Sequence, residues 1–411
     1  MAGPRIAYLE VGLTFRFTSV VPPETVTHAG LDWIEQSRPD ITDVELDLVR
    51  EALASGKLGG GGTFTDRAVE VLVAALGSSD VVLTTSGTDA LELAAMLLDI
   101  GPGDIVILPS FTFASVATAF ARGGARVRFA DIEPVTLGID PESVAELLDS
   151  SVRAVIPVHY AGVACDLPGL LKVLAEHEKA TLVEDNAHGL FGTFDGQSLG
   201  TFGRVGATSF HTTKNLVTGE GGALLINDPS LVDRAHVLAD KGTDRKAFLA
   251  GLVDKYTWRD AGSSFIMAEP LAALLVGQLR RRDEIHAARA RLHLRYLELL
   301  QPSVGKGLFS LPGERPGCDP VRHLFYVLLP SEVVRDNVAN YLREYHIAAS
   351  FHYVPLHSAP AAPRFVDRAT HCPVAEDISR RILRLPLHSG LKNDNVERIA
   401  DTFLEAVDKF V

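Results

Sequence analysis

From about residue 40 onward, apolar and polar positions follow helix-like and strand-like periods in turn. The segment DVELDLVREALAS at 43–55 has apolar residues at helical spacing, and TDRAVEVLVAALG at 65–77 repeats the pattern with Thr65 as a suitable N-cap. Residues 80–100 predict a strand, a tight turn and a helix. Further runs rich in apolar and β-branched residues read as short strands: DIVILPS, RVRFADI, AVIPVHY, TLVEDNA, ATSFHTT and ALLIND. Strands that alternate with helices predict an α/β fold whose mainly parallel sheet is covered on both faces.

The C-terminal part has a different pattern. Residues 271–300 predict one long helix, of the kind that links two lobes, and the Pro- and Gly-rich LPGERPGCDP follows it. The remainder combines strand-like HLFYVLLP with helical segments. We therefore expect a large α/β domain over residues 34–285 and a smaller α+β domain over residues 286–411. Residues 1–33 show no readable pattern and are treated as an N-terminal extension of unknown role.

Length and charge narrow the class of protein. A chain of 411 residues exceeds the size of a single core, so two lobes are expected. The formal net charge of -13 argues against nucleic acid or an anionic membrane as the main partner. No run is long and apolar enough to span a bilayer. The three cysteines show no paired or metal-binding spacing, which predicts a cytoplasmic protein with reduced thiols and no metal site.

Three predicted strand ends carry the candidate chemistry, since open α/β sheets bind ligands beyond the carboxyl ends of their strands. The turn Thr85–Thr88 precedes a helix starting near Asp89, which suits a phosphate group and equally a purely structural N-cap. Asp185 ends an apolar run, so it needs a cationic ligand atom, a buried ion pair or a capping role. Lys214 follows the third strand together with Ser209, with few other charges nearby in the sequence.

In combination, these residues fit pyridoxal phosphate. Its phosphate needs an anion site, its pyridine nitrogen needs a carboxylate, and its aldehyde reacts with a lysine amine. Phe111 or Phe113 in PSFTFAS would supply the aromatic face that packs on the ring.

Seven stretches, in order between residues 35 and 390, resemble the DegT/DnrJ/EryC1/StrS family of sugar aminotransferases. Within it the chain is most similar to transaminases that form dTDP-4-amino-4,6-dideoxygalactose. The stretches are SGKLGGGGTFT, DIGPGDIVILPSFTFAS, PVHYAGVACD, VEDNAHG, SFHTTKN with GEGGA, DKYTWRDAGSSF and FHYVPLH. The resemblance implies the aspartate aminotransferase-like fold type I and a homodimer whose active sites use both chains.

Family positions carried onto this chain imply specific roles. Lys214 would form the Schiff base, Asp185 would hold the pyridine nitrogen, and Phe113 would stack on the ring. The phosphate would be held by Gly87, Thr88, Ser209 and, across the dimer, Ser264, which stands where many relatives have asparagine. His188 stands where most relatives have glutamine, and its protonation is expected to affect the cofactor near neutral pH.

The resemblance also implies a reaction. L-Glutamate would convert the cofactor to pyridoxamine phosphate, and the amine would pass to C-4 of dTDP-4-keto-6-deoxyglucose, with Lys214 moving the proton. Residues expected near the substrate are Lys241, Arg245, Lys246, Lys255, Tyr256, Arg259, His323, His352, Tyr353 and His357. The charged residues among them equally suit a solvated loop, and the histidines a structural role.

Two other classes of function remain open from the sequence. One is a 3-aminotransferase or a cyclitol aminotransferase on the same scaffold. The other is a non-catalytic regulator that binds the cofactor or a sugar; the joint presence of Lys214, Asp185 and the phosphate turn argues against it.

Overall fold

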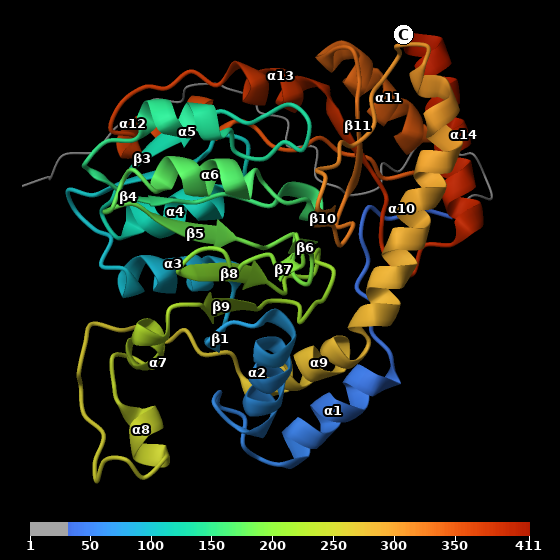
Figure 1. Cartoon of the computed structure of the whole chain (residues 1–411). Helices are drawn as coiled ribbons and strands as arrows, with labels where there is room; N and C mark the ends of the chain where they lie inside the picture. The colour runs from blue at the N-terminus through green and yellow to red at the C-terminus, as the bar shows by residue number, and fades with distance from the viewer. Residues whose placement is uncertain (1–31) are drawn as a thin grey trace, which may run out of the picture.

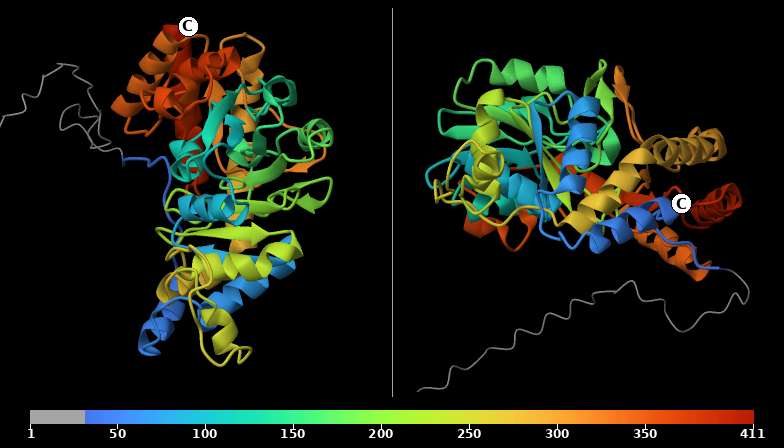
Figure 2. Two further views of the ribbon diagram at one scale, coloured as in Figure 1. Left: turned by 90° about the vertical axis from the view of Figure 1, so that its left-hand side faces the viewer. Right: turned by 90° about the horizontal axis from the view of Figure 1, so that it is seen from below.

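The computed structural model describes residues 32–411 (Figure 1). The predicted N-terminal extension, residues 1–33, lies outside the described residues except for its last two. Within the described residues, a sheet flanked by helices forms one part of the molecule, and a bundle of C-terminal helices lies beside it (Figure 2).

The central sheet has seven strands in the order β1-β9-β8-β5-β4-β2-β3. They are β1 (Asp80–Thr84), β2 (Ile105–Pro109), β3 (Arg126–Ala130), β4 (Val152–Val155), β5 (Thr181–Asp185), β8 (Val205–Ser209) and β9 (Gly222–Ile226). Only β9 runs antiparallel to its neighbours, so the carboxyl ends of the other six meet at one edge. Asp185 lies opposite Ala207, and Ser209 opposite Gly222. The predicted mainly parallel α/β sheet is confirmed.

Helices cover both faces of this sheet. Successive side chains of each strand point to opposite faces, so each face packs into a separate core. Val82 of β1 packs into one core, whereas Val81 and Leu83 pack into another. The first face is covered by α3 (Gly87–Leu97), α4 (Ala114–Arg122) and α7 (Val232–Ala239). The second is covered by α1 (Asp43–Ala54), α2 (Thr63–Leu76), α5 (Pro141–Leu147), α6 (Leu167–Leu174) and α9 (Glu269–Arg280).

The C-terminal part has a separate apolar core. Strands β11 (Phe325–Leu328) and β12 (Ile382–Leu385) pair antiparallel beside the helices α10 (Arg282–Val304), α11 (Glu332–Glu344) and α14 (Asn393–Phe410). Tyr296 stacks on Phe325 with 4.5 Å between ring centroids. The placing of a domain boundary at residue 285 stays a prediction. None of the helices within residues 32–411 is both long and apolar enough to cross a membrane.

Short elements complete the described chain. The short strands are β6 (Thr193–Phe194), β7 (Gln197–Ser198) and β10 (Cys318–Asp319), which form a small sheet. The short helices are α8 (Arg245–Leu249), α12 (Ala362–Phe365), α13 (Pro373–Arg381), η1 (Tyr160–Gly162), η2 (Pro229–Leu231) and η3 (Leu356–Ser358).

Two expectations about helices are wrong. The predicted single helix over 271–300 is interrupted at Arg281, where α9 ends and α10 begins, and the Arg281 side chain pairs with Asp40 and Glu45 near α1. Thr65 is not an N-cap, because α2 starts two residues earlier. Its first turn is instead satisfied by Glu269, whose carboxylate accepts hydrogen bonds from the backbone of residues 62, 64 and 65 and from the Thr65 hydroxyl.

Candidate active site

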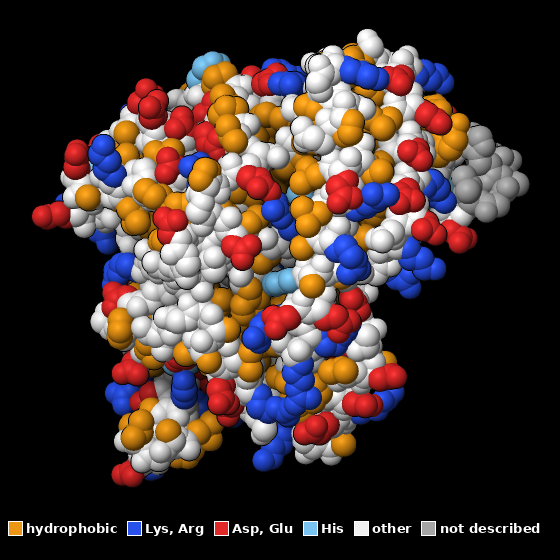
Figure 3. All heavy atoms as spheres, turned by 45° about the vertical axis from the view of Figure 1, so that its right-hand side comes forward, with side chains coloured by type: hydrophobic (Ala, Val, Ile, Leu, Met, Phe, Trp, Pro, Cys, Tyr) orange, Lys and Arg blue, Asp and Glu red, His pale blue; other side chains and the backbone are white. Residues whose placement is uncertain are grey.

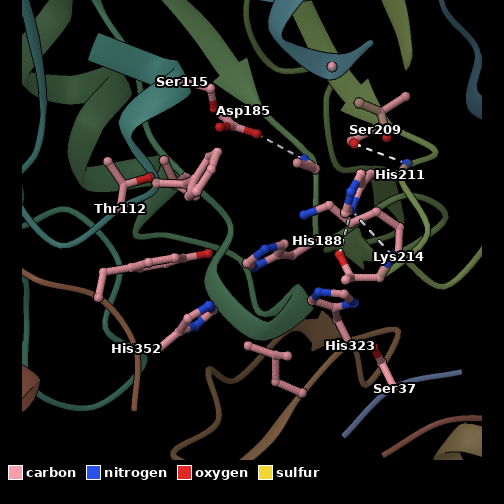
Figure 4. Close-up of a pocket in the computed structure, with 18 of the residues that line it drawn as sticks. Ser37, Thr112, Ser115, Asp185, His188, Ser209, His211, Lys214, His323 and His352 are labelled. Carbon is pink, nitrogen blue, oxygen red and sulfur yellow. Dashed lines mark hydrogen bonds between the residues drawn. The ribbon is translucent and has the colours of Figure 1, made fainter. Parts of the chain in front are cut away.

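A cavity of about 810 Å³ opens at the edge of the sheet where the six strands end (Figure 4). It is lined by the segments that follow β1, β2, β5 and β8 and by residues of the C-terminal part. Histidine side chains reach the surface near the centre of one face of the molecule (Figure 3). Because the cavity lies at the carboxyl ends of the parallel strands, it is placed where open α/β sheets bind their ligands.

Most of the cofactor residues predicted from the sequence line this one cavity. They are Gly87, Thr88, Phe113, Asp185, His188, Ser209 and Lys214, joined by the predicted substrate residues His323, His352 and Tyr353. Residues separated by more than 200 positions in the chain are thus brought together. Other predicted residues do not line it: Lys241, Arg245, Lys246, Lys255, Tyr256, Arg259, Ser264 and His357.

The start of α3 forms one wall of the cavity. Ser86 caps the helix by accepting the N–H of Asp89 at 3.0 Å. The N–H groups of Gly87 and Thr88, in the first turn, have no acceptor within the helix. A Cβ on Gly87 would lie 2.8 Å from the Cβ of Ser209, so only glycine lets the helix start this close to the β8 hydroxyl. The arrangement offers several hydrogen-bond donors and the positive end of a helix to one anion.

Asp185, the last residue of β5, presents a carboxylate to the cavity. One oxygen, Oδ1, accepts the N–H of Ala187 at 2.9 Å, and no cationic side chain of residues 32–411 forms an ion pair with the carboxylate. Burial raises its pKa, opposed by the Ala187 N–H and by the charges of Lys214 and His159. A buried carboxylate without a contacting cation suits a ligand that brings a protonated nitrogen.

Lys214 lies in the loop between β8 and β9, where its N–H donates to the carbonyl of His211 at 2.8 Å. Gly219 allows the loop to turn, since its φ of 89° is a conformation that glycine adopts without strain. Burial lowers the pKa of Lys214 to about 8; the carboxylate of Asp185 opposes the shift and the charge of Arg384 adds to it. About a tenth of the amine is therefore unprotonated, and nucleophilic, at pH 7, far more than for a lysine with an ordinary pKa.

His188 and His323 form a close aromatic pair, with ring centroids 4.2 Å apart. Burial, and then the positive charge of Lys214, lower the pKa of both rings well below the ordinary range. A lowered pKa disfavours the protonated form of both rings, so the expected protonation of His188 near neutral pH stays a prediction that its burial opposes. Its Nδ1 is buried and has no partner among residues 32–411.

The two histidines of the FHYVPLH segment, His352 and His357, lie in different surroundings. His352 stacks on Tyr353 with centroids 3.6 Å apart, and its Nδ1 lies 3.0 Å from the Tyr160 hydroxyl. His357 instead bridges Ser110, at 2.6 Å, and Glu376, at 3.0 Å, away from the cavity. Of the two histidines predicted in this segment, only His352 is placed near the candidate site.

The cations of residues 241–259 are largely neutralised by carboxylates of their own segment. Lys241 and Arg245 pair with Asp240 at 2.8 and 3.5 Å, and Arg259 pairs with Asp244 at 2.6 Å. Elsewhere on the segment, Tyr256 packs against Phe248, Lys246 lies 3.8 Å from Asp80, and Ser264 forms a β-bridge with Asp240. Within one chain this segment does not line the cavity, and its expected contact with the substrate stays a prediction.

Two arginines of the cavity were missed in the sequence. Arg384 lies on β12 and Arg289 on α10, and both line the cavity. Arg384 had a readable signal, because it is the only charged residue of the apolar run ILRLPL. Arg289 lies in a helix rich in arginine, where nothing in the pattern distinguishes it from a solvated residue.

The sequence of the chain is similar to those of known proteins. The profile of the DegT/DnrJ/EryC1/StrS aminotransferase family matches residues 39–404. The dTDP-4-dehydro-2,3,6-trideoxy-D-glucose 4-aminotransferase of Saccharopolyspora spinosa is 35% identical over 92% of this chain and 98% of its own. The UDP-N-acetyl-3-dehydro-alpha-D-glucosamine 3-aminotransferase of Acidithiobacillus ferrooxidans is 34% identical over 81% of this chain and 86% of its own.

A solved structure agrees with this grouping. A Streptococcus pneumoniae protein described as a sugar aminotransferase, in its PMP form, superimposes with a TM-score of 0.85 at 26% identity, over 92% of this chain and 98% of its own. Its PLP form gives a TM-score of 0.84. The fold type I architecture expected from the sequence is confirmed. The chain is an aminotransferase and belongs to the DegT/DnrJ/EryC1/StrS aminotransferase family.

Proposed function

We propose that this protein is a pyridoxal-phosphate-dependent nucleotide-sugar aminotransferase. It moves an amino group from L-glutamate to C-4 of dTDP-4-keto-6-deoxyglucose and so forms a dTDP-4-amino-4,6-dideoxyhexose. One observation carries the proposal: the buried amine of Lys214, the buried carboxylate of Asp185 and the start of α3 line the same cavity.

The residues present fit pyridoxal phosphate. The first turn of α3 and the Ser209 hydroxyl would hold its phosphate, and Asp185 would hold its pyridine nitrogen. Phe113 would pack on the ring, and its side chain is free to do so because the residue is 62% exposed. His188 would contact the phenolic oxygen. The cofactor agrees with the PLP and PMP forms of the S. pneumoniae relative.

The chain's own groups would then divide the chemistry. Bound pyridoxal phosphate supplies an electron sink that acidifies the α-C–H bond of the amino donor. Lys214 accepts that proton with its unprotonated amine and later returns one to the sugar carbon, as a single group at one position. Asp185 keeps the ring nitrogen protonated, because its negative charge is held in a poorly hydrated site. Because burial lowers the pKa of His188 and His323, Lys214 would be the group that moves the proton.

Amination at C-4 is supported by the S. spinosa relative, which is named for a dTDP-4-keto sugar. Amination at C-3 is the second candidate, supported by the A. ferrooxidans relative at nearly the same identity. A cyclitol acceptor would use the same catalytic groups. A non-catalytic regulator is disfavoured by the lowered pKa of the Lys214 amine, which suits a reactive group.

We also propose that two copies assemble and share active sites. The segment around α8 projects from the body of the molecule and carries gathered hydrophobic side chains (Figure 3). Leu252 and Trp258 on it are 78% and 76% exposed. Such side chains are typical of a surface that a partner covers. In this arrangement Ser264 and the cations of the segment would reach the cavity of the second copy.

The free cysteine thiols support a cytoplasmic location. Cys165, Cys318 and Cys372 are all free. Free, mostly buried cysteines are typical of proteins that work in a reducing compartment. We therefore propose that the enzyme acts in the cytoplasm.

The decisive test follows the visible absorbance of the purified protein with pyridoxal phosphate, first with L-glutamate and then with dTDP-4-keto-6-deoxyglucose. A spectrum that changes with glutamate and returns with the sugar supports the whole proposal. A return only with a UDP-linked 3-keto sugar would favour 3-amination. No spectral change when pyridoxal phosphate is added would refute the cofactor.

A further inference from the structure

A second, much smaller cavity adjoins the one described above, and His188, Ser209 and Lys214 line both of them. Asn215 and His286 complete the polar part of its lining. Its volume is about 10 Å³, close to the space that one water molecule needs. A polar cavity of this size holds a water when two or more hydrogen-bonding groups reach it. We call it the small chamber.

The two ring nitrogens of His188 have different surroundings. Nδ1 is buried and forms no hydrogen bond with any residue of the described part of the chain. The ring also lines the main cavity, so Nε2 is the nitrogen left for a ligand there. A buried polar atom without a partner is costly, and in folded proteins ordered water usually satisfies one that no protein group reaches. The small chamber is the place for such a water.

His286, in the first turns of α10, is the side chain best able to hold this water from the other side. Asn215 has both amide atoms in hydrogen bonds with other residues, the Ser209 hydroxyl already accepts a backbone N–H, and the Lys214 amine would react with the cofactor. Nothing among residues 32–411 hydrogen-bonds to the His286 ring. Burial lowers the pKa of His286 to about 4, which favours an uncharged ring with one donor and one acceptor nitrogen.

We propose that one water molecule in the small chamber links His286 to His188 and thereby fixes the tautomer of His188. The water accepts a hydrogen bond from the His286 ring and donates one to Nδ1 of His188. Nε2 of His188 then carries the proton and donates a hydrogen bond to the phenolic oxygen of the cofactor. His286 is thus a positioning residue that acts through His188. The contact with the cofactor rests on the proposed function.

The tautomer matters because the two forms of an uncharged imidazole act oppositely on that oxygen. With the proton on Nε2 the ring donates a hydrogen bond to it, whereas with the proton on Nδ1 the ring turns a lone pair toward it. The neighbouring His323 does not select between them. Its ring packs against that of His188 with centroids 4.2 Å apart, and its Nδ1 is bonded to Asn215 instead. The water and His286 supply the missing selection.

The first test uses the full chain without cofactor, so that its outcome does not depend on the proposed function. A high-resolution crystal structure should show a water within hydrogen-bond distance of both His188 Nδ1 and the His286 ring. Long-range proton–nitrogen spectra of histidine-labelled protein should show Nε2 of His188 protonated, with the signal assigned by its loss in His188→Gln. A chamber without a water, or a proton on Nδ1, would overturn the inference.

The second test is a double-mutant cycle on the affinity for pyridoxamine phosphate, which binds without reacting with Lys214. His286→Leu should raise its Kd about fivefold, the effect of one weakened hydrogen bond. His286→Gln keeps a donor and should raise it by less than about twofold. In a His188→Gln background, His286→Leu should also change the Kd by less than about twofold, because an amide has no tautomer to set.

His293→Leu is the matched control. His293 lies on the same helix and is buried, and its Nδ1 has no partner in the described structure, but it lines neither cavity. Equal losses of affinity from His286→Leu in both backgrounds, or an equal loss in His293→Leu, would overturn the inference and assign His286 a role in the fold alone. Failure of the wild type to bind pyridoxamine phosphate would instead refute the proposed cofactor, and the water and tautomer of the cofactor-free protein would still decide the link between His286 and His188.

Discussion

The His323 ring packs against that of His188, tilted by 35°, and the same side chain contacts Asn215, the residue next to Lys214. Its Nδ1 lies 2.8 Å from Oδ1 of Asn215, whose Nδ2 donates to the carbonyl of Val321 at 3.1 Å. Because that amide oxygen can only accept, the His323 Nδ1 carries the proton and its Nε2 is unprotonated. One imidazole thus contacts both the His188 ring and the loop that carries Lys214.

Cofactor association should depend on pH through Lys214. Since burial lowers the pKa of this amine from 10.5 to about 8, the protonated form dominates below pH 8 and cannot attack an aldehyde. The association rate of pyridoxal phosphate with the apoprotein should rise about tenfold per pH unit below that pH and level off above it. Stopped-flow absorbance measures this rate. A rate still rising steeply between pH 9 and 10 would contradict the lowered pKa.

Replacement of Lys214 by alanine should abolish transamination without unfolding the protein. In the proposed mechanism the amine both reacts with the cofactor and moves the proton, so the rate of the glutamate half-reaction should fall at least about 1,000-fold. Single-turnover absorbance gives the rate, and circular dichroism reports the fold. Lys172→Ala, on the outer helix α6, serves as the control. Turnover by Lys214→Ala at the wild-type rate would remove this residue from the mechanism.

Asp185→Asn should impair proton removal more than cofactor binding. The amide cannot hold the pyridine nitrogen protonated, whereas the phosphate anchor at α3 is unchanged. We expect the half-reaction to slow by about 100- to 1,000-fold, with the Kd of pyridoxal phosphate raised by a much smaller factor. Rapid mixing with glutamate measures the first quantity and equilibrium titration the second. Equal losses in both would mean that Asp185 serves mainly as an anchor.

Gly87→Ala should weaken recognition of the phosphate specifically. The new Cβ would lie 2.8 Å from the Cβ of Ser209 and force the start of α3 away from β8. Such overpacking costs about 1–3 kcal/mol, so the Kd of pyridoxal phosphate should rise about tenfold or more. Pyridoxal, which lacks the phosphate, should bind with nearly unchanged affinity. Gly59→Ala is the control, since nothing lies within 4 Å of its added Cβ.

Local patterns in the sequence predicted the strands and their ends well. Asp185 and Ser209 are the last residues of β5 and β8, as the apolar runs before them indicated. Lys214 stood out because a charge in an apolar, Gly-rich surrounding has few structural uses. These features are encoded within a few residues, so they can be read from one segment at a time.

Features that depend on distant partners were not predicted. The cap of α2 comes from Glu269, and the break at Arg281 is stabilised by carboxylates near α1. The lowered pKa of His188 follows from burial and from the charges around it, which a linear pattern does not contain. Arg289 looked like a surface residue because its burial depends on how α10 packs.

The pairing of β1 has a consequence for synthesis of the chain. Among the strands of residues 32–411 it pairs in the sheet with β9 alone, with Asp80 opposite Ile226, and its neighbour α2 is capped by Glu269. As the chain leaves the ribosome, β1 must wait about 140 residues for β9, and α2 must wait more than 190 residues for Glu269. Nascent chains that end before residue 269 should therefore keep this region open to proteases or chaperones, and its docking is a late step of folding.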